Sequence, residues 1–240
     1  DDARYTLAIN IDNGRINVTG ETRLVNGLGL ANTLVGNNKP LRFTASGVAL
    51  GLYQAQSISV QQVGNARKLN AKIRFDYREI SLPSDTVNKS ILWNLGDADL
   101  AIGANSHVFS ADGIAFYNFI KSNIAVNSAL DKRQLVGIEL SVTGASEDLA
   151  SYIEINQPSS NLAQNKPEYT NLDVTEGFKV IGIFTSRYTM KEYKFAVGGI
   201  SQIRAIDKKS LRELCEGPIT GTLGFCSNHM ADGDFSAPCP

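Results

Sequence analysis

The residues best suited to chemistry gather at the end of the chain, which closes on CSNHMADGDFSAPCP. Cys215, Cys226, His229 and Cys239 are the ligand types that close a tetrahedral zinc site. Such sites normally carry two close pairs of ligands, whereas here only Cys226 and His229 are near each other in sequence. The spacing therefore favours a disulfide, and a metal site on these four residues is the lesser alternative.

The pairing that the sequence predicts is a bridge between Cys215 and Cys226, which would tie a helix to the loop after it. A tail punctuated by Gly and Pro has little apolar surface, and a bridge would restrict its unfolded state, which stabilises the fold by about 3 kcal/mol. Cys239 is then either a thiol or the site of a bond to another chain. We expect residues 215–240 to form an irregular, disulfide-tied tail, and we expect no cofactor.

A hydrolytic triad would need one of the two histidines, and His107 lies close to Ser106 and Asp112. Adjacent side chains on a strand point to opposite faces, so Ser106 and His107 cannot pair directly. The G-x-S-x-G motif that carries the nucleophile of many hydrolases does not occur. Asp97 and Asp99 could bind calcium, but they lack the spacing of an EF-hand loop. The sequence therefore predicts no catalytic residues.

The chain holds 23 Lys and Arg residues against 24 Asp and Glu residues, a formal net charge of -1. A near-neutral chain has no net field to attract nucleic acid or anionic lipid. No apolar run in the sequence reaches the roughly 18 residues of a membrane-spanning helix. We therefore expect neither a nucleic-acid partner nor a membrane-spanning segment.

Compartment is indicated by the start of the chain and by its cysteines. The chain opens on Asp1-Asp2-Ala3 without an initiator Met, and all three cysteines follow residue 214. Few, late cysteines in a chain rich in Asn, Thr, Ser and Gly suit an exported β protein. These features predict an extracellular or cell-surface protein from which a leader peptide has been removed.

A period of two, typical of half-buried strands, begins at once: Tyr5, Leu7, Ile9 and Ile11 share one face. Asn13-Gly14 follows, and this pair favours a tight turn because both central positions need positive φ. The pattern predicts an opening hairpin. Its apolar row at a chain terminus is the candidate assembly strand, able to pair within its own chain or with a neighbour's open sheet edge.

Further strands are predicted at residues 69–77, 136–142, 152–156, 178–184 and 193–200. In the first of them the apolar set moves from Tyr77 to Ile80, an odd step that predicts a β-bulge near Arg78-Glu79. Residues 104–123 fit either a strand or a helix, and residues 157–171 read as a long exposed loop.

One helix is well marked, at about residues 208–216. Ser210 and Glu213 fit a capping box, and Gly217-Pro218 ends the helix. Together these patterns predict a mainly β fold, an antiparallel β-sandwich or jelly-roll-like architecture with one short C-terminal helix. We expect a single β domain over residues 1–240, the alternative being two β modules divided between about residues 100 and 135.

The stretch NGRINVTG, eight of the 240 residues, resembles the first strands of bacterial fimbrial subunits. Those subunits close on an alternating strand and this chain closes on SAPCP, so the resemblance bears on class alone. The first hypothesis is an exported structural or adhesive protein, a filament, matrix or coat subunit whose partners are other copies of itself.

The second hypothesis is a carbohydrate-binding module or β-fold glycosidase, with a glycan or host-surface ligand as partner. Its resources are aromatic side chains able to stack on sugar rings if they share a face: Trp93, Tyr53, Tyr117, Tyr188 and Tyr193.

Overall fold

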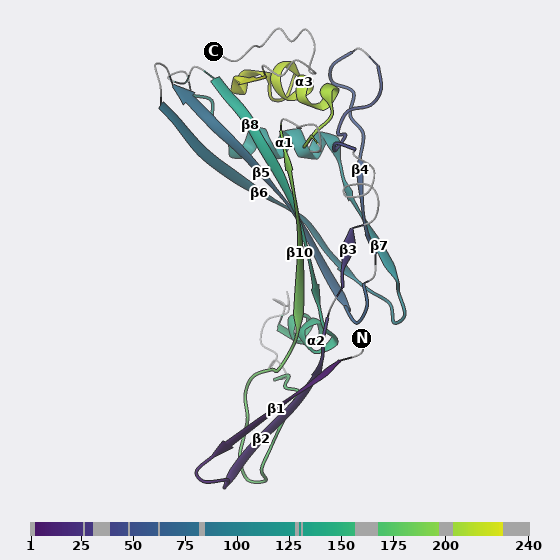
Figure 1. Ribbon diagram of the computed structural model, residues 1–240, viewed down its shortest axis with the longest axis vertical. Coiled ribbons are helices and arrows are strands. Elements are labelled where there is room, and N and C mark those ends of the chain that lie inside the picture. The colour runs from purple at the N-terminus through teal and green to yellow at the C-terminus, as the bar shows by residue number, and fades with distance from the viewer. Residues whose placement is uncertain are drawn as a thin grey trace, which may run out of the picture.

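The computed structural model of the chain describes residues 3–25, 27–30, 39–47, 49–61, 63–81, 85–127, 130, 132–156, 168–196 and 204–227. This part of the chain is mainly β with antiparallel sheets, as the sequence predicts. It contains three α-helices, where the sequence marks one clearly. The molecule is elongated, with a β-hairpin at one end and helix α3 (Lys208–Glu216) at the other (Figure 1).

The largest sheet is built around two long neighbouring strands, β5 (Lys68–Ser81) and β8 (Lys132–Ala145). β6 (Asp85–Asp99) forms one edge, while β10 (Arg187–Phe195) and the parallel β11 (Phe225–Cys226) pair with the other side of β8. The sheet takes strands from both sides of the region between residues 100 and 135.

A smaller sheet consists of β3 (Gly29–Leu30), β4 (Gln56–Gln61) and β7 (Ser106–Ala111). Helix α1 (Gly113–Asn123) follows β7 directly, and Asp112 Oδ1 accepts a hydrogen bond of 2.8 Å from the backbone N–H of Ala115. This cap begins the helix. Residues 104–123, which the sequence leaves open between strand and helix, therefore contain one of each.

The core lies on one face of the large sheet, called the inner face below. Its central row comes from β5, and every member is at most 5% exposed: Leu69, Ala71, Ile73, Phe75 and Tyr77. The small sheet, α1 and α3 supply the apolar side chains that cover this row. The ring of Phe75 meets the edges of Phe116 and Phe225 at centroid distances of 6.1 and 5.8 Å.

The strand predicted at residues 152–156 is wrong, because these residues belong to helix α2 (Glu147–Asn156). The residues that favour a helix over a strand lie at the N-terminus of α2. Ser146 Oγ accepts from the backbone N–H of Leu149 at 3.5 Å, and Glu147 and Asp148 place acidic side chains in the first turn. Both features stabilise a helix N-terminus.

The C-terminal helix is confirmed at residues 208–216, and Gly217 is its C-cap. The predicted capping box is wrong, because Asp207 caps the helix by accepting from the N–H of Ser210 at 3.0 Å. The two box residues instead bind a distant segment. Ser210 Oγ accepts from the N–H of Phe43 at 2.9 Å, and Glu213 Oε1 accepts from the Tyr53 hydroxyl at 2.8 Å. Burial, with this hydrogen bond, raises the pKa of Tyr53.

The β-bulge predicted at Arg78-Glu79 is also wrong. β5 keeps its alternation, and the extra residues lie in its neighbours: Val136 in β8 and Leu95 in β6. Glu79 therefore points to the inner face, where it is buried. The position tolerates a carboxylate because Glu79 Oε1 accepts from Arg133 at 3.0 and 2.9 Å, and Glu79 Oε2 lies 2.6 Å from Lys89 Nζ. A buried charge needs such partners.

We expect Phe75→Ala to lower the free energy of unfolding by about 3–5 kcal/mol, because β5 is central and the vacated space is enclosed by other rings. Leu92→Ala, on the exposed side of β6, is the control and should cost within about 0.5 kcal/mol. Urea unfolding measures the free energy of unfolding of both variants. Equal losses in the two would show that Phe75 is not a central residue of the core.

A second prediction concerns pH. Burial alone would raise the pKa of Glu79, but hydrogen bonds from Lys89 and Arg133, with their charges, outweigh it and lower this pKa. The ion pairs therefore stabilise the fold fully above the unfolded pKa of about 4.3, and this stabilisation is lost as the pH falls through the folded pKa. Glu79→Gln should flatten the acid side of the stability curve, measured by urea unfolding across pH.

The control for this pH series is Glu21→Gln, which removes an exposed carboxylate paired with Arg4. Exposed pairs contribute little, so this variant should keep the wild-type pH dependence. Parallel curves for the wild type and Glu79→Gln would show that Glu79 is not responsible for the acid sensitivity.

Candidate assembly surface

A three-stranded sheet, here called the arm, projects from one end of the molecule (Figure 1). Its strands are β1 (Arg4–Ile11), β2 (Ile16–Arg23) and β9 (Leu172–Val174), in the order β1-β2-β9. Arg15 N–H donates to the carbonyl of Asp12 at 3.1 Å, and Asn13 and Gly14 have φ values of 53° and 87°. The predicted hairpin and its turn are confirmed.

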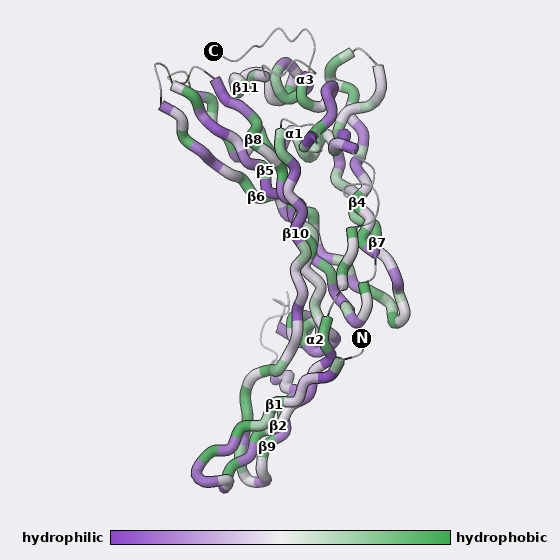
Figure 2. Tube along the Cα trace, viewed as in Figure 1, coloured by the Kyte–Doolittle hydropathy of each residue, from purple (hydrophilic) through white to green (hydrophobic). Residues whose placement is uncertain are grey.

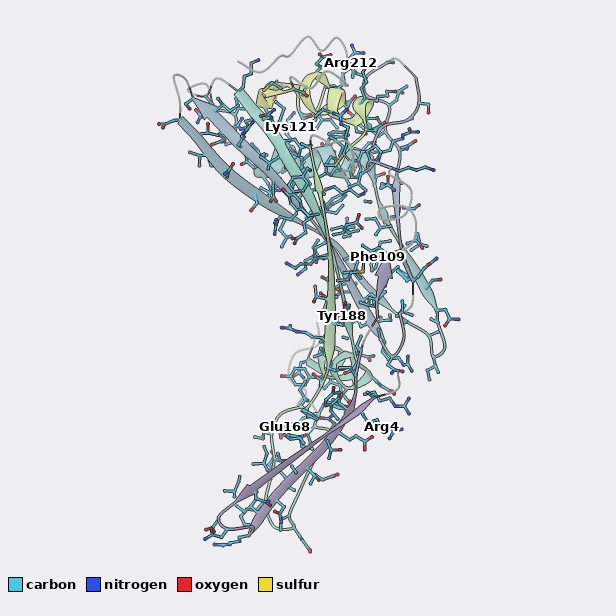
Figure 3. The ribbon with its side chains drawn as sticks, viewed as in Figure 1. Arg4, Phe109, Lys121, Glu168, Tyr188 and Arg212 are labelled. Carbon is cyan, nitrogen blue, oxygen red and sulfur yellow. The ribbon has the colours of Figure 1, made fainter. Side chains whose placement is uncertain are left out.

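The arm has one polar and one apolar face. On the polar face Arg4 Nη1 lies 2.6 Å from Glu21 Oε1, near the point where the arm joins the body (Figure 3). On the other face the register aligns Ile9 with Val18 and Val174, and it aligns Leu7 with Gly20 and Leu172. The period of two thus places the predicted apolar row on one side of the arm.

Only part of the apolar face is covered. Over β2 the covering side chains lie so close that a Cβ on Gly20 would stand 2.6 Å from Leu172 Cδ2 and 3.5 Å from Phe184 Cβ. Val18 is buried beside it. On β1, by contrast, Tyr5 is 54%, Ile9 43% and Ile11 49% exposed, while Leu7 is half-buried. The predicted assembly strand is therefore an exposed apolar row.

The covering segment adds apolar surface of its own. Residues 178–184, predicted as a strand, form none, and Phe184 N–H instead donates to Asn171 Oδ1 at 2.9 Å. Phe178 and Ile181 in this segment are exposed. Figure 2 shows hydrophobic stretches along the arm.

β1 is the last strand of its sheet within the described residues, so one side of its backbone is unpaired. Proteins usually protect such edges with charged side chains, prolines, bulges or a covering segment. β1 contains no proline, its register with β2 is continuous, and its one charged residue is Arg4. The strand thus combines an open backbone edge with an exposed apolar row.

The base of the arm is fixed to the body by polar contacts. Ser186 Oγ donates to the carbonyl of Arg23 at 2.5 Å and accepts from the N–H of Val25 at 2.9 Å. Asp148, in the first turn of α2, accepts from the hydroxyls of Thr22 at 3.4 Å and Tyr169 at 3.1 Å. These bonds give the arm a defined direction.

The aromatic side chains considered for sugar binding do not form one platform. Tyr53 and Tyr117 meet at 5.5 Å, but Tyr117 is fully buried. Trp93 stacks on Phe119 of α1 at 5.9 Å. Tyr188 and Tyr193 stand five positions apart on β10, on opposite faces, and Tyr193 lies beneath the Arg74 guanidinium.

The residues considered for a hydrolytic triad have structural roles. The His107 ring lies edge-on to Phe109 at a centroid distance of 4.7 Å, and Asp112 caps α1. Among the described residues, no three His, Cys, Asp or Glu side chains converge on a common point. His229 and Cys239 of the alternative zinc set lie outside the described residues.

The predicted bridge between Cys215 and Cys226 is wrong. Cys215 is a buried thiol on the same side of α3 as Leu211 and Leu214, where it packs as a small apolar residue. Cys226, on β11, is disulfide-bonded. Because Cys215 is a thiol, it is not the partner of Cys226.

We expect alkylation to distinguish these two cysteines. Cys215, a buried thiol, should react after unfolding alone, whereas Cys226, which is also buried, should react only when the protein is both unfolded and reduced. Peptide mapping by mass spectrometry after each treatment is the measurement. A peptide pair joining Cys215 to Cys226 in an unreduced digest would restore the sequence-based pairing.

None of the described helices is both long and apolar enough to cross a bilayer. Comparison of the sequence with protein-family models and with curated proteins finds no match. Function must therefore be argued from the geometry of the molecule itself.

Proposed function

We propose that this protein is an exported structural or adhesive subunit that associates with copies of itself through the arm. The observation that carries this proposal is the exposed row Tyr5, Ile9 and Ile11, on a strand whose outer edge is unpaired within the described part of the chain. Exposed apolar surface beside an open edge is a site for protein contacts. A filament, matrix or coat at the cell surface would use such contacts repeatedly.

The energy available from the row sets a limit on this contact. Fully burying a large apolar side chain contributes about 1.5–3 kcal/mol, so three half-exposed ones contribute roughly 2–4 kcal/mol. Association costs about 4–15 kcal/mol in lost freedom of motion. The row alone is therefore too small for a stable contact, and backbone pairing along the open edge has to contribute as well.

The proposal includes a β-sandwich architecture for the subunit. Residues of the small sheet, such as Ile58 and Phe109, share one core with Ile73 and Leu140 of the large sheet. This shared core supports a β-sandwich in which helices complete the second layer.

We expect Ile9→Lys to abolish self-association while leaving the fold intact, because a charge in the row opposes burial and the side chain is already half exposed. Thr19→Lys places the same charge on the polar face of the arm and is the matched control. Sedimentation velocity over a range of concentrations measures association, and thermal unfolding checks the fold.

Wild-type protein that stays monomeric at every concentration would refute the proposed function. Equal assembly of Ile9→Lys and wild type would show that the arm is not the contact.

A further inference from the structure

The large sheet has its own open edge. β6 is the outermost strand on its side, and no other strand in the described part of the chain pairs with its outer side. At 15 residues it is longer than β1, which has eight. An added strand the length of β1 would therefore find backbone partners along its whole extent.

The inner face is incompletely covered at this edge. The register with β5 places Val87, Ile91 and Trp93 on the inner face, opposite Glu79, Phe75 and Ile73. The β5 residues are buried, whereas Ile91 and Trp93 are half-buried and Val87 is 55% exposed. The core thus runs to the edge of the sheet and stops there with apolar side chains partly uncovered.

We propose that β1 of a second copy adds to β6, extending the large sheet by one strand and covering this end of the core. The inference rests on the proposed function and names the surface that receives the arm. β1 need not leave β2, because its unpaired side is the one that would meet β6. Main-chain hydrogen bonds would then join two open edges, each of which presents unpaired N–H and C=O groups to a partner strand.

The period of two restricts the register. Alignment of the two apolar rows on one face pairs odd-numbered residues of β1 with odd-numbered residues of β6, since a slip of one residue would turn the row to the polar face. The antiparallel register that overlaps the rows most fully is given by four pairs: Tyr5 with Trp93, Leu7 with Ile91, Ile9 with Lys89, and Ile11 with Val87. It sets the two aromatic side chains across from each other, which is a favourable cross-strand pair.

Lys89 does not oppose this arrangement. Its Nζ lies 2.6 Å from Glu79 Oε2, so its charge is already paired and its aliphatic stem faces Ile9 in the proposed register. The antiparallel direction also agrees with the pairing of β5 with β6 and with β8.

Charge supports a copy of the same chain as the occupant. The hairpin at residues 4–23 contains three Arg, one Asp and one Glu, a net charge of +1. β6 contains one Lys and three Asp, a net charge of -2. In the antiparallel register Arg4 comes next to Asn94, close to Asp97, so opposite charges meet at that end of the added strand. At the other end the turn beside Asp85 carries Asp12 and Arg15, which pair with each other and add no net charge.

The contact would be head-to-tail, because each copy gives β1 and receives at β6, two different surfaces. A head-to-tail contact builds a ring if the rotation closes and an open filament if it does not. Each copy then has one donating and one receiving surface in use, and growth proceeds at both ends.

The test is disulfide capture between two single variants. Ile11→Cys and Val87→Cys are both at exposed positions, and the proposed register sets them directly opposite, within reach of a disulfide. We expect an equimolar mixture to give a covalent dimer under mild oxidation on a non-reducing gel. Each variant alone, and wild type with its native cysteines, should not give that band.

Two matched mixtures test the register. Tyr5→Cys with Val87→Cys separates the thiols by six residues of strand, roughly 20 Å, and should not form the dimer. Ile11→Cys with Thr86→Cys places the thiols on opposite faces and should also fail. Capture by either of these mixtures in place of the first would overturn the proposed register.

The proposal and the function it rests on fail in different ways. If sedimentation shows assembly but no mixture is captured, β6 is not the receiving edge and the proposed function stands. If the protein does not assemble at all, both are overturned.

Discussion

The fold depends on the need to cover one face of β5. Its period of two places five apolar side chains in a row on the inner face and then, at the next inward position, Glu79. The small sheet and two helices pack against the apolar row on that face. The carboxylate cannot be covered in the same way, because a buried charge requires partners.

Arg133 meets that requirement and organises one end of the molecule. Besides Glu79, its guanidinium donates to the carbonyls of Leu223 at 2.6 Å and Ala125 at 2.9 Å. One buried side chain thus holds the start of β8, the segment after α1 and the approach to β11 together. Removing one partner of such a group would leave the other charge buried and unpaired, which is strongly destabilising.

The same alternating pattern has a different outcome in the arm. β1 carries an apolar row as regular as that of β5, but residues 171–186 cover β2 and leave β1 exposed. At the other open edge, β6 extends the inner face beyond the elements that cover it. An elongated molecule with an uncovered strand on the arm and an uncovered edge on the main sheet is suited to directional contacts between copies.

Local sequence determined the elements whose signals are local. The hairpin follows from alternation around Asn13-Gly14, and the last helix follows from a short amphipathic stretch that ends at Gly217. Each depends on backbone conformations set by neighbouring residues.

Tertiary structure decided what those residues contact. Ser210 and Glu213 matched a capping box but bind residues 43–53, because side chains brought close by folding compete with local partners. The odd step of the apolar set from Tyr77 to Ile80 suggested a bulge, but β5 keeps its alternation and turns Glu79 inward. Arg133, 54 residues away in sequence, makes that inward position favourable for a carboxylate. The exposure of Tyr5, Ile9 and Ile11 could not be predicted from the sequence pattern either. Alternation fixes which side chains share a face of a strand, but not whether another segment covers that face.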